Sequence, residues 1–144
     1  MAKTRKNDHF AFSAVIKICE RSGGKCENPK CGAYTDFEAV EDRPSNHGLH
    51  HVFFKSEYFG TDRNMAWNGA NLCERCHNSI HHAGGQPGLA LNLHLKKQAL
   101  KRYRGTLRPA LFSLMKRREH RLRELFGKPL AEVKTKPVEP EFAY

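Results

Sequence analysis

Residues 71–82, NLCERCHNSIHH, bring two cysteines and three histidines into one short stretch. All five side chains are potential metal ligands. A single zinc-finger site needs about a dozen residues between its cysteine pair and its histidine pair, so that the chain can turn back. Here Cys76 and His77 are adjacent, so these cysteines and histidines cannot readily converge on one tetrahedral ion. The stretch therefore predicts two metal sites rather than one.

The other ligands for a cysteine site come from CENPKC, residues 26–31. Pro29 and Gly32 mark a tight turn, of the kind that directs two thiolates at one point. A C-x₄-C pair and a C-x₂-C pair together supply four thiolates, which form a closed structural zinc site. Four buried thiols without metal are the alternative, and we expect Cys19 to be a core thiol. The predicted zinc ligands are Cys26, Cys31, Cys73 and Cys76.

The histidines predict a second kind of site. His77 and His81 are four residues apart, so a helix places both imidazoles on one face. In LHHVFF, residues 49–54, neighbouring strand residues point to opposite faces. One of His50 and His51 can therefore bind the metal while the other stays unligated close by. A metal with open positions beside an unligated imidazole is what hydrolysis requires.

Hydrophobic periodicity and turn residues predict a chain of mixed helices and strands. LALNLHL, residues 89–95, alternates as a strand does, but KKQALKRYR continues directly and favours a helix. Pro109 suits the first turn of a final helix, and Gly127 suits its end. The expected elements are a helix over 10–21, strands over 37–40 and 49–54 with a loop over 41–48 between them, and helices over 73–83, 92–104 and 109–126.

Charge is the next informative feature of the chain, which has a formal net charge of +10. Residues 96–123 contain eleven lysines and arginines against one acid, Glu119, so the whole excess lies there and the rest is balanced. Such a stretch predicts a polyanionic partner, most simply nucleic acid, with a solvated helix face as the alternative. We expect Tyr58 and Trp67 to pack beneath the site rather than to stack on bases. The candidate DNA-binding residues are Lys96, Lys97, Lys101, Arg102, Arg104, Arg108, Lys116, Arg117, Arg118, Arg121 and Arg123.

The composition also bears on the compartment. No apolar run approaches the roughly 20 residues that a membrane-spanning helix requires, and the charged start MAKTRKNDHF is not followed by a signal-peptide apolar stretch. We therefore expect a cytoplasmic protein without a membrane partner. In that compartment thiols stay reduced, so five cysteines indicate metal binding more than disulfides.

Taken together, CENPKC, LHHVFF and WNGANLCERCHNSIHH resemble the HNH endonucleases, a family with the ββα-metal fold. Members commonly carry His-His or Asp-His on a first strand, an Asn after the second strand, and a helix with Cys-x-x-Cys-His-x-x-x-His. The resemblance covers roughly residues 26–82, a little over a third of the chain. It implies an endonuclease that cuts DNA and leaves 5′-phosphate and 3′-hydroxyl ends, and by analogy a phage or mobile-element setting.

The resemblance also implies roles for particular residues. His50, His77 and His81 would hold the catalytic metal, and His51 would be the general base. Asn68, nine residues before His77, would orient the base or its loop, with Asn71 as the other candidate. The four cysteines match the structural zinc knuckle of many members.

Two features depart from the family pattern. His50 stands where many members have Asp, which makes the site softer and shifts the preference toward zinc or nickel over magnesium. The catalytic ion is therefore expected among Mg²⁺, Mn²⁺, Ni²⁺ and Zn²⁺. His82 is an additional histidine, which we expect at the surface or beside the ligands rather than among them.

The sequence thus predicts an α+β fold: a small ββα-metal core stapled by a four-cysteine zinc site, with an N-terminal helix and C-terminal basic helices. The expected division is a nuclease core over 1–90, a basic helical extension over 91–127, and a disordered tail over 128–144. The expected function is metal-dependent hydrolysis of DNA. A non-catalytic zinc module that binds nucleic acid, or an RNase, is the alternative.

Overall fold

A computed structural model describes most of the chain between Phe10 and Gly127. The described residues are 10–35, 49–54, 56–58, 60, 62–83, 85–103 and 108–127, with His82 and Ala83 as backbone alone. Several predictions fall outside these residues: the strand over 37–40, the loop over 41–48, the tail over 128–144, the role of Arg104, and the side chain of His82.

Helix α1 (Phe12–Ser22) confirms the helix expected over 10–21. Its periodic apolar residues give it a buried face, and Gly23 ends it with a φ of 63°. Glycine adopts this left-handed conformation without the steric cost of a Cβ. The chain then turns directly into the cysteine loop, residues 26–31.

Strands β1 (Leu49–His51) and β2 (Gly69–Asn71) form an antiparallel pair. The strand expected over 49–54 therefore ends three residues early. Val52 N–H still donates to Asn68 O in register with the ladder (2.9 Å), whereas Phe53 N–H donates to the side-chain oxygen of Asn68 (2.8 Å). At Phe53 the chain is therefore bonded to a side chain rather than to the backbone of a partner strand.

The segment after β2 forms the short helix α3 (Glu74–Asn78), which continues as the π-helical turn η3 (Ser79–Ala83). The helix expected over 73–83 is thus confirmed, with a change of winding halfway. π-Helical turns occur frequently at functional sites.

Two long helices follow, α4 (Gln86–Arg102) and α5 (Arg108–Phe126). The helix expected over 92–104 begins at Gln86, so the strand-like alternation of 89–95 is misleading. Helix α4 is buried on most of its circumference, and such a helix lacks the clean 3.6-residue pattern of a surface helix.

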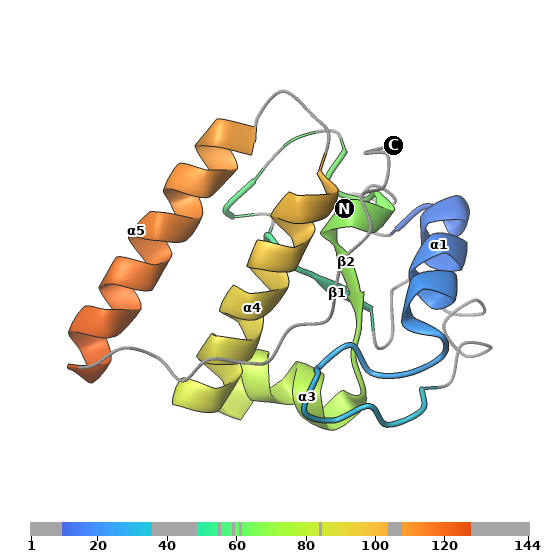
Figure 1. The fold of residues 1–144 in the computed structure, drawn as a ribbon, viewed down its shortest axis with the longest axis horizontal. Coiled ribbons are helices and arrows are strands. Elements are labelled where there is room, and N and C mark those ends of the chain that lie inside the picture. Colours follow the sequence, from blue (N-terminus) through green and yellow to red (C-terminus); the bar gives the residue numbers. More distant parts are fainter. Residues whose placement is uncertain are drawn as a thin grey trace, which may run out of the picture.

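The two faces of the sheet meet different helices (Figure 1). One hydrophobic cluster joins α1 to the sheet, and a larger one joins the sheet to α4 and α5. A Cβ on Gly69 would lie 2.3 Å from Ile18 Cδ1, so glycine lets α1 pack directly on β2. Since adjacent strand residues point to opposite faces, His50 is directed toward α4 and His51 toward α1.

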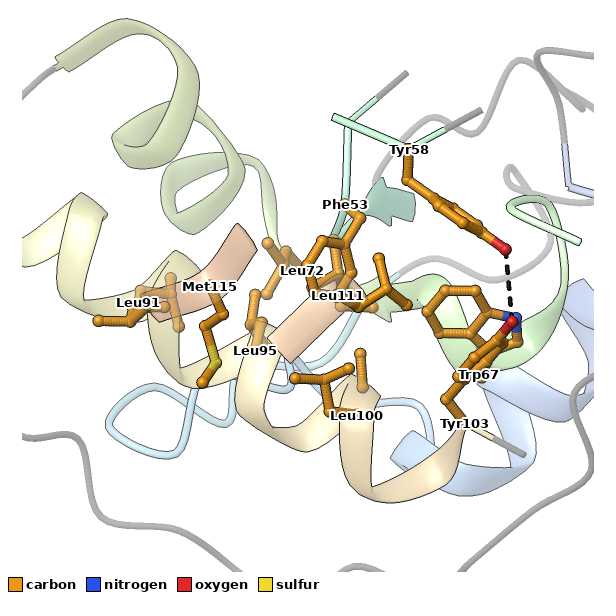
Figure 2. Packing of buried hydrophobic residues seen from close by; sticks show 14 of the residues in the cluster. Phe53, Tyr58, Trp67, Leu72, Leu91, Leu95, Leu100, Tyr103, Leu111 and Met115 are labelled. Atoms are coloured by element: carbon orange, nitrogen blue, oxygen red, sulfur yellow. Dashed lines mark hydrogen bonds between the residues drawn. The ribbon is translucent and has the colours of Figure 1, made fainter. Parts of the chain in front are cut away.

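The larger cluster contains Trp67 of the single-turn helix η2 (Ala66–Asn68), and the Trp67 side chain is fully buried beside Tyr58 and Tyr103 (Figure 2). The centroid of the Trp67 ring lies 4.3 Å from that of Tyr103 and 5.8 Å from that of Tyr58. The hydroxyls of Tyr58 and Tyr103 are 3.4 Å apart. Tyr58 and Trp67 therefore pack in the interior, as expected, and are not exposed for stacking on bases.

The same cluster contains residues from Cys26 to Met115. The boundary predicted between residues 90 and 91 falls inside α4, so the supposed extension shares its core with the cysteine loop. None of the described helices is long and apolar enough to cross a membrane.

Candidate metal centres

The four predicted zinc ligands come together from two distant segments. The sulfur atoms of Cys26, Cys31, Cys73 and Cys76 all lie within 4.8 Å of one another. The Sγ atoms of Cys31 and Cys73 are 3.8 Å apart, which matches the edge of about 3.8 Å expected for a tetrahedron with Zn–S bonds of about 2.3 Å. All five cysteines of the chain are free thiols. This group fits a metal ion such as zinc.

Backbone and side-chain hydrogen bonds shape the cysteine loop. Cys26 N–H donates to Ala33 O (2.7 Å), and Cys31 N–H donates to Asn28 O (2.9 Å). The Asn28 side chain caps the turn by accepting from Lys30 N–H (3.1 Å), and its amide lies 3.3 Å from Cys76 Sγ. The turn that Pro29 and Gly32 indicated therefore also contacts the second cysteine pair.

The thiols differ in their ease of ionisation. Burial raises the pKa of Cys26 and Cys76. A hydrogen bond from the backbone of Ala33 is the main cause that lowers the pKa of Cys31, to about 7. A bound divalent ion would deprotonate all four thiols, because its own charge dominates the local field.

An ion pair that the sequence did not indicate ties this loop to the sheet. The Arg21 guanidinium on α1 binds both carboxylate oxygens of Glu27 (2.9 Å each) and also donates to the carbonyl oxygens of Ala66 and Gly69. Glu27 in turn accepts from Asn71 N–H (2.7 Å). Such bidentate pairs fix orientation as well as adding energy.

The predicted catalytic ligands form a second group. One ring nitrogen from each of His50, His77 and His81 lies within 4.8 Å of the other two. These residues come from β1, α3 and η3. His50 is 1% exposed, whereas His81 is exposed, so the group opens toward solvent on one side. Three imidazoles with open positions suit a divalent ion such as Zn²⁺ or Ni²⁺.

His50 is the buried anchor of this group. Its Nδ1 lies 3.3 Å from His81 Nε2, and its Nε2 lies 3.1 Å from Asn92 Oδ1 on α4. Burial holds the pKa of His50 well below its usual range, so the ring is neutral at physiological pH and offers a lone pair. The Phe54 ring packs against His50 and His81, with centroid separations of 5.7 and 5.3 Å.

His51 has entirely different partners. Its ring stacks on Phe10 with centroids 4.1 Å apart and an angle of 12°. Its Nε2 lies 2.7 Å from Asn64 Oδ1. The two adjacent imidazoles thus diverge, as the alternation of the strand predicted. Sequence reasoning missed Asn64, because nothing distinguishes it within a polar loop.

Asn68 is fully buried and acts on the backbone. Its amide donates to the carbonyl oxygens of Phe53 and Arg63 (3.2 and 2.9 Å) and accepts from Phe53 N–H. It therefore holds the loop after β1 to the loop that carries Asn64. The expected role of Asn68 toward a catalytic base stays a prediction. Asn71, the other candidate, bonds instead to Glu27 of the cysteine loop through its backbone N–H and carbonyl oxygen.

Two of the candidate DNA-binding residues are core residues, which corrects the prediction for them. Lys96 is 2% exposed; its Nζ donates to Val52 O (2.7 Å) and pairs with Glu57 (2.9 Å). Arg102 is 3% exposed and donates to Trp67 O (3.0 Å). Buried cations with such partners cannot reach the phosphates of DNA. Their position on the buried face of α4, rather than their residue type, determines that they are inaccessible.

The other described candidates remain at or near the surface. Arg108 is half-buried, and Arg118 and Arg123 are exposed but paired with Glu57 and Glu119 (2.8 and 3.1 Å). The remaining exposed cations of α4 and α5 are Lys97, Lys101, Lys116, Arg117 and Arg121. No family model, curated protein or solved structure matches this chain.

Proposed function

We propose that the protein is a metal-dependent endonuclease of the HNH type, which hydrolyses phosphodiester bonds of DNA. The observation that carries the proposal is the convergence of His50, His77 and His81, with His51 following His50 directly on β1. The element order β1, β2, α3 around this group is that of a ββα unit. The His51 imidazole is held in one orientation by Phe10 and Asn64, which a module that only binds nucleic acid would not need.

The role of the histidine group follows from its donors. A divalent ion held by the three imidazoles would stabilise the negative charge that develops on the scissile phosphate and on the departing 3′ oxygen. The exposure of His81 leaves that side of the group accessible to a large substrate.

His51 would act as the general base. Since its Nε2 faces Asn64 Oδ1, that nitrogen carries the proton and Nδ1 is the basic atom. Nδ1 takes a proton from water, and the hydroxide attacks phosphorus in line. The bond from phosphorus to the 3′ oxygen breaks, its electron pair stays on that oxygen, and solvent protonates it. The products carry 5′-phosphate and 3′-hydroxyl ends.

The exposed cations of α4 and α5 would bind phosphates beyond the cleaved bond. Contacts of this kind are largely independent of sequence and weaken steeply as salt increases. Helices α4 and α5 pack against each other, so their cations belong to one rigid part of the protein.

A plasmid assay tests the proposal. The full chain, with zinc retained in the cysteine site, is incubated with supercoiled DNA and Mg²⁺, Mn²⁺, Ni²⁺ or Zn²⁺. We expect nicking by the parent and a loss of about 10²- to 10⁴-fold in His51→Ala, the usual contribution of a general base. His120→Ala, which alters an exposed histidine outside both groups, serves as the matched control.

The outcomes separate the alternatives. Cleavage by His51→Ala at the parent's rate would remove the assignment of the base. DNA binding without cleavage in any of the four metals would favour a non-catalytic zinc module, and cleavage of RNA alone would favour an RNase.

A further inference from the structure

The two ring nitrogens of His50 face different neighbours. Nδ1 lies 3.3 Å from His81 Nε2, inside the histidine group, whereas Nε2 lies 3.1 Å from Asn92 Oδ1. The nitrogens are on different edges of one ring, so only Nδ1 is directed at an ion shared with His81. A neutral imidazole carries one proton, and whichever nitrogen holds it cannot bind the metal.

Asn92 decides where that proton resides. An amide oxygen accepts a hydrogen bond and cannot donate one, so Asn92 Oδ1 favours the tautomer of His50 with hydrogen on Nε2. His50 is 1% exposed, which leaves water little opportunity to replace this partner. The remaining lone pair is then on Nδ1, where the histidine group needs it.

The position of Asn92 is fixed by contacts of α4 one turn before it, at Gly88, and one turn after it, at Lys96. Gly88, Asn92 and Lys96 are spaced by four residues, so they share one face of α4. A Cβ on Gly88 would lie 2.0 Å from Ser79 O, which means that α4 meets η3 backbone to backbone there. One turn beyond Asn92, Lys96 donates to Val52 O (2.7 Å) in the loop that follows β1.

We propose that Asn92 is a positioning residue of the catalytic metal site, which holds the His50 imidazole as the Nε2–H tautomer with Nδ1 toward the ion. The inference rests on the metal site of the proposed function. It makes α4, most of which the sequence assigned to a basic helical extension over 91–127, a structural part of the site. Outer partners that orient a histidine ligand in this way typically change metal affinity by about 10- to 100-fold when removed.

Nickel binding to the full chain, with zinc retained in the cysteine site, tests the proposal by calorimetry without DNA. We expect Asn92→Ala to bind Ni²⁺ about 10- to 100-fold more weakly than the parent. Asn92→Asp, which keeps an oxygen acceptor, should recover most of the affinity. Asn78→Ala is the matched control, because Asn78 is an exposed amide on α3, and it should bind as the parent does.

A second measurement reads the tautomer directly. Long-range ¹H–¹⁵N spectra of the imidazoles, recorded before nickel is added, should report His50 as the Nε2–H form in the parent and as a mixture in Asn92→Ala. A purely structural role would change thermal stability without changing the tautomer.

Three results would overturn the inference: equal nickel affinity in Asn92→Ala and the parent, an Nδ1–H tautomer of His50 in the parent, or no nickel binding outside the cysteine site. Weakened nickel binding in Asn92→Ala, in a parent that cuts no nucleic acid, would support the role of Asn92 while rejecting the nuclease. The two proposals are therefore tested separately.

Discussion

His50 and His51 are neighbours in the chain, yet each is held by its own asparagine. Asn92 contacts the first and Asn64 contacts the second. The sequence predicted that one imidazole would be ligated and the other not, because strand alternation is a local property. It could not identify the partners, which lie 42 and 13 residues away. One sequence feature did point to Asn92: it is the single polar residue within the otherwise apolar segment 89–93.

Asn64 can be tested independently of His51. We expect Asn64→Ala to slow cleavage by about 10- to 100-fold, less than the loss of the base itself, because the imidazole remains but its orientation is no longer fixed. Nickel affinity should be unchanged, since Asn64 contacts His51, which lies outside the group of three imidazoles proposed to hold the metal. Single-turnover plasmid nicking measures the first effect, with Asn78→Ala as control. Equal rates in Asn64→Ala and the parent would contradict the role.

Lys96 shows why a basic stretch in the sequence is not automatically a DNA surface. Its ammonium group lies over the Phe53 and Phe54 rings, 4.8 and 4.9 Å from their centroids, and pairs with Glu57. Glu57 also accepts from Phe54 N–H and from Arg118 (2.9 and 2.8 Å). This buried pair fixes the loop that follows the two site histidines.

The stability of the protein should depend on Glu57, the acidic partner of the buried Lys96. We expect Glu57→Ala to lower the free energy of unfolding by about 3–5 kcal/mol, because it leaves the Lys96 charge buried without a counter-ion. Arg118→Ala removes only the exposed partner and should cost about 0–1 kcal/mol. Urea denaturation of zinc-loaded protein measures both. Similar small losses in the two variants would mean that Lys96 is not charged in the folded protein.

Helix α3 connects the cysteine group and the histidine group, the two candidate metal sites. Cys73 is its N-cap residue, and Cys76 immediately precedes His77. Residue spacing was sufficient to predict both groups, since C-x₂-C and H-x₃-H patterns fix local geometry. The change to a π-helical turn at Ser79 and the packing of α4 on η3 were not predictable, because they arise from tertiary contacts rather than from local preference.

Removal of a structural ligand should therefore affect both groups. We expect Cys73→Ser to lose zinc, to unfold at lower temperature, and to bind nickel at the histidine group far more weakly, because structural zinc contributes directly to folding. Metal analysis, thermal denaturation and calorimetry measure the three effects. Cys19→Ser is the control, since Cys19 lies outside the cysteine group. A stable, zinc-free Cys73→Ser protein would contradict the structural role of the site.

Positive and negative charges balance in the chain outside residues 96–123, and the exposed cations that the structure describes in that segment lie on helices α4 and α5. The excess positive charge of +10 lies in residues 96–123 of the sequence. Two of the cations in this segment, Lys96 and Arg102, are buried in the interior. The sequence gives the number of charges, but only those that are exposed in the folded protein can bind a polyanion. The exposed set is consequently smaller than predicted and lies on α4 and α5.

Burial of a further titratable group links the stability of the molecule to pH. His94 on α4 is 7% exposed. Burial, reinforced by the nearby positive charges of Lys101, Lys97 and Arg102 and only partly opposed by Glu27, lowers the pKa of His94 to about 4. The folded protein thus binds a proton on His94 only in strong acid, whereas the unfolded chain does so near the ordinary histidine pKa of 6.5.

Below that unfolded pKa the unfolded chain holds more protons, so the free energy of unfolding falls as pH decreases from about 6.5 toward 4. We expect His94 to account for a loss of about 2 kcal/mol between pH 7 and pH 5, at 1.36 kcal/mol per pKa unit. Replacement by an apolar residue of similar size removes this proton, so His94→Leu should have a flatter profile in urea denaturation. His120→Gln, at an exposed position, should follow the parent. Both variants retain the cysteine group and the histidine group, so acid effects on metal binding cancel in the comparison. Parallel profiles for His94→Leu and the parent would show that His94 does not cause the loss of stability in acid.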